Sequence, residues 1–162
     1  MTIDEVYGTR PDYLPRSIIR AARVDIGGRP RTGWVGRSGV KFLDLHQHDE
    51  YEEASIRRFS RRSDGTVVWG EVPKSLVLKA GDCDSLDIVD TIQEFMPDSN
   101  ILIFFWDSLL MPSVEMENQY LKAYIGGIIA QVAEFWVYSP DGQVLIENTL
   151  RGEITAAKVP SA

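Results

Sequence analysis

Six consecutive apolar residues, Ile101–Trp106, constrain the fold of this chain more than any other feature of its sequence. Polar turn residues (Pro-Asp-Ser-Asn, 97–100) precede the run and an aspartate follows it. A short, uninterrupted apolar run bounded by turn residues is typical of a strand buried on both faces, although a buried helical segment has the same pattern. The isoleucines and aromatic residues favour the strand. We therefore expect the rest of the chain to pack around a central strand at Ile101–Trp106.

An acidic, amphipathic helix is predicted immediately before this strand, over residues 84–96. Asp84 or Ser85 suits its N-cap, and Asp87 falls in the first turn, where the helix dipole favours a negative charge. Apolar side chains recur along it at helical spacing. The opposite side of this helix gathers three acids: Asp87, Asp90 and Glu94.

The remaining segments alternate between helix and strand patterns. Residues 1–12 lack periodicity and are expected to be irregular. The predicted elements are a helix at 14–24, a loop at 27–30, strands at 32–35 and 40–45, a hairpin over 55–71 around an Asp-Gly turn, a short strand at 76–78, a helix at 114–125 (or a strand at 120–125), a hairpin of 128–138 with 143–150, and a short strand at 153–156. One face of the strand at 128–138 is expected to be partly wet. These patterns predict one α+β domain over residues 1–162, with a mostly antiparallel sheet and two or three helices packed on it.

Charge is distributed unevenly along the chain. The net charge is −7, but residues 1–62 hold 12 Lys/Arg against 9 Asp/Glu, whereas residues 63–162 hold 5 against 15, so the first part carries +3 and the second −10. An asymmetry of this size bears on partners and association rates and not on the fold. The acidic part is expected to repel nucleic acid and to attract a basic surface. The alternative is that it is a solvating face.

Cysteine content and hydropathy indicate the compartment. Cys83 is the single cysteine, so an internal disulfide framework is excluded and a reducing cytosol is the simplest setting. The N-terminal residues lack the basic flank and apolar stretch of a signal peptide. The longest apolar run is far short of the ~18 residues of a membrane span. We therefore expect a cytoplasmic protein without a membrane partner.

The two histidines, His46 and His48, lie beside several acids. If the strand at 40–45 continues, both imidazoles point to one face, a spacing that can hold a divalent metal with a nearby carboxylate. With Asp44, the pattern Asp-x-His-x-His resembles the first metal motif of the amidohydrolase barrels. This resemblance implies a small metal-dependent enzyme that uses the histidines with Asp44 or Asp49. Such a barrel needs far more than 162 residues, and the alternative is a polar strand end that runs into an acidic loop. On this alternative we expect neither a metal nor another cofactor.

A cluster of four arginines lies in the first strand of the hairpin predicted at 55–71. Such a cluster can grip phosphates or nucleic acid. Phe59 is the only aromatic residue interleaved with it, and the negative net charge of the chain argues against a nucleic-acid partner. The alternative is an exposed edge strand whose charges discourage further pairing. The arginines are Arg57, Arg58, Arg61 and Arg62.

The sequence contains no Gly-x-Ser-x-Gly elbow, no phosphate-binding loop and no Cys-x-x-Cys pair. In overall character, being small, acidic, α+β and poor in motifs, the chain resembles bacterial immunity proteins that neutralise nuclease-type toxins. That resemblance implies a non-enzymatic protein that inhibits a basic toxin stoichiometrically, with acidic side chains covering the toxin's phosphate-binding surface. The expected partner-binding residues are Asp82, Asp84, Asp87, Asp90 and Glu94.

Overall fold

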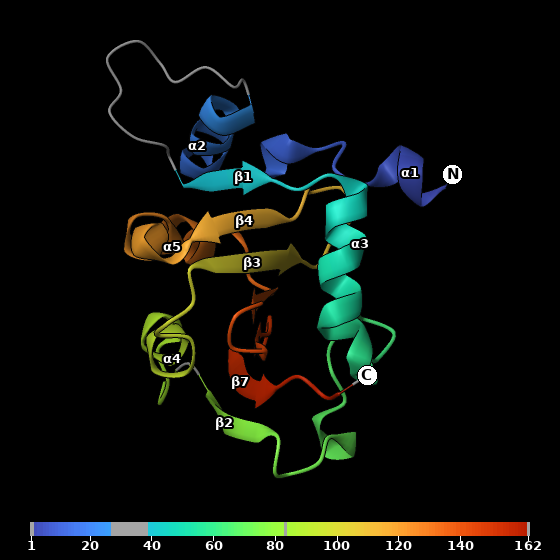
Figure 1. Cartoon of the computed structure of the whole chain (residues 1–162), viewed down its shortest axis with the longest axis vertical. Helices are drawn as coiled ribbons and strands as arrows, with labels where there is room; N and C mark the ends of the chain where they lie inside the picture. The colour runs from blue at the N-terminus through green and yellow to red at the C-terminus, as the bar shows by residue number, and fades with distance from the viewer. Residues whose placement is uncertain (1, 27–38, 83, 162) are drawn as a thin grey trace.

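A seven-stranded antiparallel sheet forms the centre of the protein (Figure 1). The computed structural model describes residues 2–26, 39–82 and 84–161. The strand order is β1-β4-β3-β5-β6-β7-β2, and every neighbouring pair is antiparallel. The predicted α+β class with a mostly antiparallel sheet is therefore confirmed. The strands are β1 (Val40–Phe42), β2 (Val77–Asp82), β3 (Ile101–Trp106), β4 (Val114–Glu117), β5 (Phe135–Ser139), β6 (Val144–Asn148) and β7 (Glu153–Lys158).

The strand β3 has the bounds that the apolar run predicts, and it pairs with β4 on one side and β5 on the other. Its side chains alternate between the two faces of the sheet. Leu102, Phe104 and Trp106 belong to one core, whereas Ile103 and Phe105 belong to the other. All five are buried, which confirms a strand covered on both faces.

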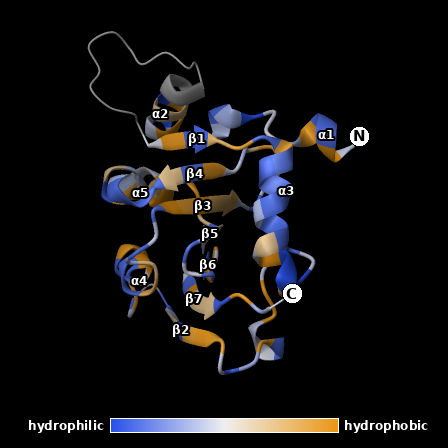
Figure 2. Ribbon diagram, in the orientation of Figure 1, coloured by the Kyte–Doolittle hydropathy of each residue, from blue (hydrophilic) through white to orange (hydrophobic). Residues whose placement is uncertain are grey.

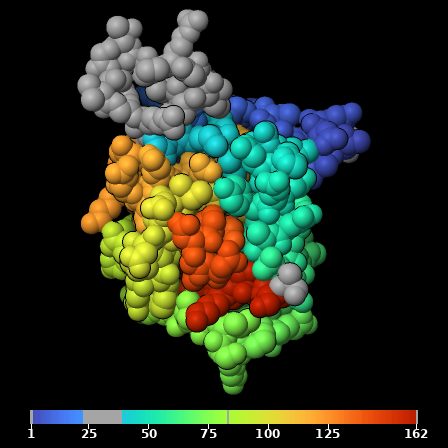
Figure 3. Space-filling view, viewed as in Figure 1, coloured from blue at the N-terminus to red at the C-terminus, as the bar shows by residue number. Residues whose placement is uncertain are grey.

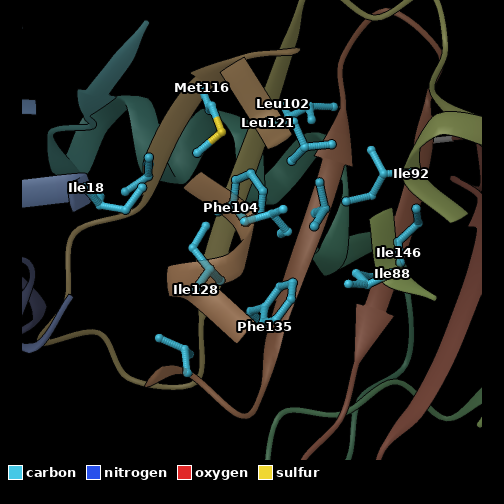
Figure 4. Packing of buried hydrophobic residues seen from close by; sticks show 14 of the residues in the cluster. Ile18, Ile88, Ile92, Leu102, Phe104, Met116, Leu121, Ile128, Phe135 and Ile146 are labelled. Atoms are coloured by element: carbon cyan, nitrogen blue, oxygen red, sulfur yellow. The ribbon is translucent and has the colours of Figure 1, made fainter. Parts of the chain in front are cut away.

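Helices cover one face of the sheet, and a helix with an irregular segment covers the other. On the first face, α2, α4 and α5 pack apolar side chains such as Ile18, Ile92 and Ile128 around Phe104 (Figure 4). On the second face lie α3, which is hydrophilic along most of its length (Figure 2), and residues 55–76. The sheet thus carries about four helices, more than the two or three predicted. The helices are α1 (Ile3–Val6), α2 (Arg16–Ile26), α3 (Leu45–Ala54), α4 (Ile88–Phe95) and α5 (Leu121–Gln131).

The N-terminal segment is more regular than the sequence predicts. It contains α1 and a short 3₁₀ turn at Pro11–Tyr13, and Gly8 N–H and Arg10 N–H donate to the carbonyl groups of residues 109 and 110. The prediction of an irregular start is therefore wrong in part, because these hydrogen bonds fix a segment without periodicity. The helix predicted at 14–24 is confirmed as α2. The predicted loop at 27–30 and strand at 32–35 lie outside the described residues.

Residues 55–71 do not form the predicted hairpin. One isolated bridge joins Arg61 to Val67 around the Asp-Gly turn, where Gly65 has a φ of 93°. Short 3₁₀ turns at Ile56–Arg58 and Trp69–Glu71 flank this bridge. The segment forms no hairpin because its buried apolar residues are irregularly spaced along the chain. In a strand they would alternate with a period of two. These residues are Ile56, Phe59, Val67 and Val72.

Residues 114–125 form a strand and then a helix. In β4, Val114 and Met116 are buried and the two glutamates between and after them are half-buried, a period of two that the helix prediction overlooked. A 3₁₀ turn at Asn118–Tyr120 leads into α5, so the alternative strand at 120–125 is also wrong. The adjacent glycines do not end α5. A Cβ on Gly127 would lie 3.3 Å from the hydroxyl oxygen of Ser17, so glycine here permits the close approach of α2.

The C-terminal part of the sheet follows the sequence prediction with one displaced boundary. Because α5 extends to Gln131, the strand predicted from residue 128 begins only at Phe135. Trp136 and Tyr138, expected on a partly wet face, are buried because residues 55–76 cover them. The hairpin of β5 with β6 is confirmed. The two predicted short strands are present as β2 and β7, but they extend to Asp82 and Lys158, beyond the predicted ends at residues 78 and 156. Among the described residues, no helix is long and apolar enough to cross a membrane.

Candidate functional site

The five acids expected to bind a partner lie along one piece of chain, from the end of β2 into α4. Asp82 ends β2, Asp84 lies in the following turn, and Asp87 is the N-cap of α4. Asp90 and Glu94 lie one helical turn apart on α4. All five side chains are exposed. We call these five residues the acidic surface.

The helix begins later than predicted because Asp82 holds the preceding residues in a turn. Its Oδ1 accepts hydrogen bonds from the backbone N–H groups of Asp84 (3.2 Å) and Ser85 (3.1 Å). The N-cap is therefore neither of these two residues. It is Asp87, whose Oδ1 accepts a hydrogen bond from the N–H of Asp90 at 3.0 Å. The placement of Asp87 inside the first turn was thus wrong, although its interaction with the helix N-terminus is confirmed.

The members of the acidic surface differ in how far the fold already uses their carboxylates. The turn-forming Asp82 and the N-cap Asp87 accept backbone N–H groups. Glu94 lies 3.0 Å from the Nζ of Lys79. Within residues 2–26, 39–82 and 84–161, the carboxylates of Asp84 and Asp90 have neither an ion pair nor a hydrogen bond. These two groups are available to a partner's cations.

A sixth acid, Glu153, adjoins the acidic surface across the sheet edge. Glu153 of β7 lies directly opposite Asp82 of β2 in the strand register, and both side chains are exposed. Like charges directly opposite each other on an antiparallel pair destabilise it. A cationic side chain placed between them would relieve that repulsion.

An open groove of about 730 Å³ lies beside the C-terminal end of α4. The residues that line it include Gln93, Asn100, Glu117 and Gln119. Gln93 lies three residues after Asp90 on α4, and residues three apart are neighbours on a helix surface, so the groove adjoins the acidic surface. The amide and carboxylate oxygens suit a polar or cationic side chain.

The two histidines do not share a face. The strand has ended before them, and Asp44 caps α3 through a capping box. Residues two apart on a helix do not face the same side. His46 is therefore exposed beside Glu50, 3.0 Å away, whereas His48 is buried. Both sequence interpretations, the continued strand and the acidic loop, are wrong because the capping box starts a helix at this point.

His48 belongs to a buried polar network that joins three segments. Its Nδ1 lies 2.6 Å from the hydroxyl oxygen of Ser113, and its Nε2 lies 2.9 Å from a carboxylate oxygen of Glu52, off the direction of a hydrogen bond. The N–H of Ser113 donates to the hydroxyl of Tyr7, which donates to the carbonyl of Leu43. Burial raises the pKa of Tyr7 to about 12.

Serine, histidine and glutamate in this order are the groups of nucleophilic hydrolases. Here, however, Ser113 and His48 are each only 2% exposed, so the hydroxyl lies out of reach of a substrate. Burial raises the pKa of Glu52, but the close positive charge of His48 and the hydrogen bond and charge of Arg57 outweigh burial and hold that pKa below its usual range. The network therefore holds α3 against β4. In the described ranges, no group of three or more His, Cys, Asp or Glu residues is arranged to hold a metal ion.

The four clustered arginines are bound to groups of the chain itself. Arg57 forms ion pairs with Asp49 (2.9 Å) and Glu52 (2.8 Å). The other three donate hydrogen bonds to backbone carbonyl groups, those of residues 160, 65 and 67 respectively. The expected edge strand is wrong because the segment is not a strand. A phosphate would have to compete with these internal acceptors.

Glu147 of β6, which is 2% exposed, was not predicted from the sequence as a buried or functional residue. Its Oε2 accepts hydrogen bonds from the backbone N–H of Val67 and the indole N–H of Trp136, both at 2.8 Å. Its Oε1 accepts the indole N–H of Trp69 at 2.9 Å. Glu147 thereby fastens residues 55–76 to the sheet. The only sequence signal was one acid inside the apolar run Val144–Asn148.

Comparison of the chain with protein-family models, and separately with curated proteins, found no match. The acidic surface, Glu153 and the adjoining groove are therefore interpreted from their geometry and charge alone.

Proposed function

We propose that the chain is a protein-binding module that docks a basic protein on the acidic surface. The observation that supports this proposal most directly is the pair Asp84 and Asp90, whose exposed carboxylates have no partner in the part of the chain that the structure describes. Together with the opposed Asp82 and Glu153 they concentrate negative charge at one corner of the sheet. A partner that supplies lysines or arginines gains charge-assisted hydrogen bonds and relieves that repulsion.

The biological role that we propose is toxin neutralisation in the cytosol. A nuclease-type toxin has a basic surface that binds phosphate. An exposed cluster of carboxylates is electrostatically complementary to such a surface. The inhibitor then covers the toxin's substrate site without chemistry of its own. Long-range attraction between the two surfaces makes association fast, which protects a cell that makes both proteins.

The two alternative functions have less support. The metal-dependent enzyme required both histidines on one face, and α3 separates them. The phosphate binder required the arginines of residues 57–62, and their guanidinium groups already bind carboxylates or carbonyl groups. Neither alternative has a specific observation in its favour.

The test is an association-rate measurement with matched charge variants. The partner to test is the product of an adjacent open reading frame that ends in a basic domain, and the absence of such a reading frame would count against toxin neutralisation. The double variant Asp84→Lys with Asp90→Lys changes the two acids whose carboxylates have neither an ion pair nor a hydrogen bond in the described part of the chain. The control, Asp4→Lys with Glu50→Lys, changes exposed acids of α1 and α3. Each double variant changes the net charge from −7 to −3, so the pair isolates position from total charge.

At low salt we expect the first double variant to associate about tenfold or more slowly than the wild type, and the control to associate at nearly the wild-type rate. The difference in association rate between the first double variant and the wild type should become smaller as added salt screens the charges. The wild-type chain should also abolish the growth arrest that the partner domain causes when expressed alone. Equal rates for the two double variants would exclude the acidic surface as the docking site, and unrelieved growth arrest would exclude toxin neutralisation.

A further inference from the structure

The strand β2 is the last strand of the sheet and pairs on one side only, with β7. Within the residues that the structure describes, no further strand pairs with its other side. In Figure 3 the green atoms of the chain around β2 form the lower surface of the molecule. An edge strand presents a row of unpaired backbone N–H and C=O groups, which can pair with a strand of another chain. Whether β2 does so depends on which of its groups point outward.

The direction of these groups follows from the hydrogen bonds of β7. Along an antiparallel ladder, successive residues direct their N–H and C=O groups to opposite sides. The carbonyl of Glu153 accepts from Thr149, on the β6 side, whereas the N–H of Lys158 donates to the carbonyl of Leu76, on the β2 side. The N–H and C=O groups of even-numbered residues of β7 therefore point toward β2, and those of odd-numbered residues point toward β6.

This alternation directs two residues in the regular part of β2 outward. They are Asp82, whose C=O already accepts the N–H groups of Ser85 and Leu86, and Ala80. Ala80 lies opposite Thr155, an odd-numbered residue that faces β6, so the N–H and C=O of Ala80 point away from β7. Its side chain is exposed, and no backbone hydrogen bond from elsewhere in the described chain reaches it. Ala80 thus offers one donor and one acceptor to an incoming strand.

The usual protections of an edge strand are incomplete on β2. The register shifts between Val77 and Lys79, a bulge that disturbs pairing at the start of the strand. The remaining residues, 79–82, pair regularly with β7. The charge of Lys79, a residue type that discourages pairing at a sheet edge, is held 3.0 Å from Glu94 of α4. The regular end of β2 is therefore the part open to pairing.

We propose that β2 accepts an added strand from a basic protein partner, paired through the backbone of Ala80. This inference rests on the proposed function and names the form in which the partner is bound. The acids Asp82 and Asp84 follow Ala80, and Glu153 lies on the neighbouring strand, so lysine or arginine side chains of the added strand meet carboxylates on arrival. Main-chain pairing supplies affinity and these charges supply selectivity. A second copy of the chain is disfavoured because it carries the same acids and a net charge of −7.

The experiment uses the full chain and a defined probe, an eight-residue peptide of alternating lysine and valine. The control peptide has the same composition with its alternate backbone nitrogens methylated, which removes the donors and keeps the charge. Amide NMR spectra and hydrogen exchange report on Ala80 directly. We expect the first peptide to shift the Ala80 amide and to slow its exchange, and the methylated peptide to do neither.

Two variants at the same position separate backbone pairing from side-chain effects. Ala80→Pro removes the outward donor at an edge position where proline does not break the β7 ladder. Ala80→Val keeps the donor and suits a strand. We expect Ala80→Pro to weaken binding of the alternating peptide about tenfold and Ala80→Val to leave it within about twofold. Unchanged far-ultraviolet circular dichroism of both variants confirms that the fold is retained.

The outcomes distinguish this inference from the function on which it rests. If Ala80→Pro binds the peptide and the basic partner as the wild type does, strand addition is wrong while docking on the acidic surface stands. If Asp84→Lys with Asp90→Lys has no effect on the partner, the docking surface itself is wrong. Concentration-dependent dimerisation without peptide, lost in Ala80→Pro, would assign the edge to a second copy and overturn the proposal.

Discussion

The substitution Glu147→Gln tests the account of the buried carboxylate, because it keeps the shape of the side chain and removes one acceptor. A glutamine oxygen in the position of Oε2 keeps the hydrogen bonds from Val67 and Trp136. The glutamine NH₂ then faces the indole N–H of Trp69, where Oε1 had accepted at 2.9 Å. One charge-assisted hydrogen bond is lost and two donors face each other without an acceptor. A neutral amide costs less to bury than a carboxylate, and this offsets part of the loss. We therefore expect the unfolding free energy to fall by about 3 kcal/mol.

A double-mutant cycle identifies the source of that loss. In a Trp69→Phe background the opposing donor is gone, so we expect Glu147→Gln to cost about 1–2 kcal/mol less there than in the wild type. The measurement is urea denaturation followed by far-ultraviolet circular dichroism, which does not depend on the tryptophan removed. The reasoning is refuted if Glu147→Gln costs the same in both backgrounds to within about 0.5 kcal/mol, or if it costs nothing.

Two further predictions concern Tyr7 and the acids of α4. Burial raises the pKa of Tyr7 from 10.0 to about 12, so its stabilising contribution is fully present below pH 10 and is lost as pH rises through about 12. The Tyr7→Phe variant should lack this alkaline loss of stability. The difference between the denaturation midpoints of the wild type and the variant should therefore become smaller as the pH rises from 9 to 12. Asp87→Ala should lower the unfolding free energy by about 1 kcal/mol because it removes the N-cap, whereas Asp90→Ala should change it by less than about 0.5 kcal/mol. Equal losses in urea denaturation would contradict the division of roles between these two acids.

The central strand was predictable because its own residues decide its state. Ile101–Trp106 is apolar on both faces, and its isoleucines and aromatic residues favour a strand covered on both sides over a buried helix. The 55–71 segment was not predictable in the same way. Its Asp-Gly turn is present, but its flanks take their conformation from Glu147, 80 residues after Val67, and from the pockets that Phe59 and Val72 fill. Contacts this distant override local strand propensity.

The boundary between β4 and α5 shows a second limit of sequence reasoning. Val114–Glu117 alternates for only four residues, too few to outweigh the helical pattern that follows. Adjacent glycines usually end a helix, yet Gly127 lies inside α5 because α2 approaches it. That approach is a tertiary fact with no local signal. The prediction for the two histidines was wrong for a related reason. The capping box of Asp44 with Gln47 is visible in the sequence, but the apparent strand before it was given more weight.

The sequence predicted the residues of the candidate site. Only the structure shows which of these acids contribute to the fold and which do not. Asp82 and Asp87 contribute to the fold by accepting backbone N–H groups, and Glu94 is paired with Lys79. Asp84 and Asp90 show no comparable structural gain, and the opposition of Asp82 to Glu153 costs stability. We propose that these charges, which the fold does not use and which lie at a corner where like charges already repel, bind a partner that neutralises them. Because the open edge of β2 leads directly into this corner, the same partner can be held by its backbone and selected by its charge.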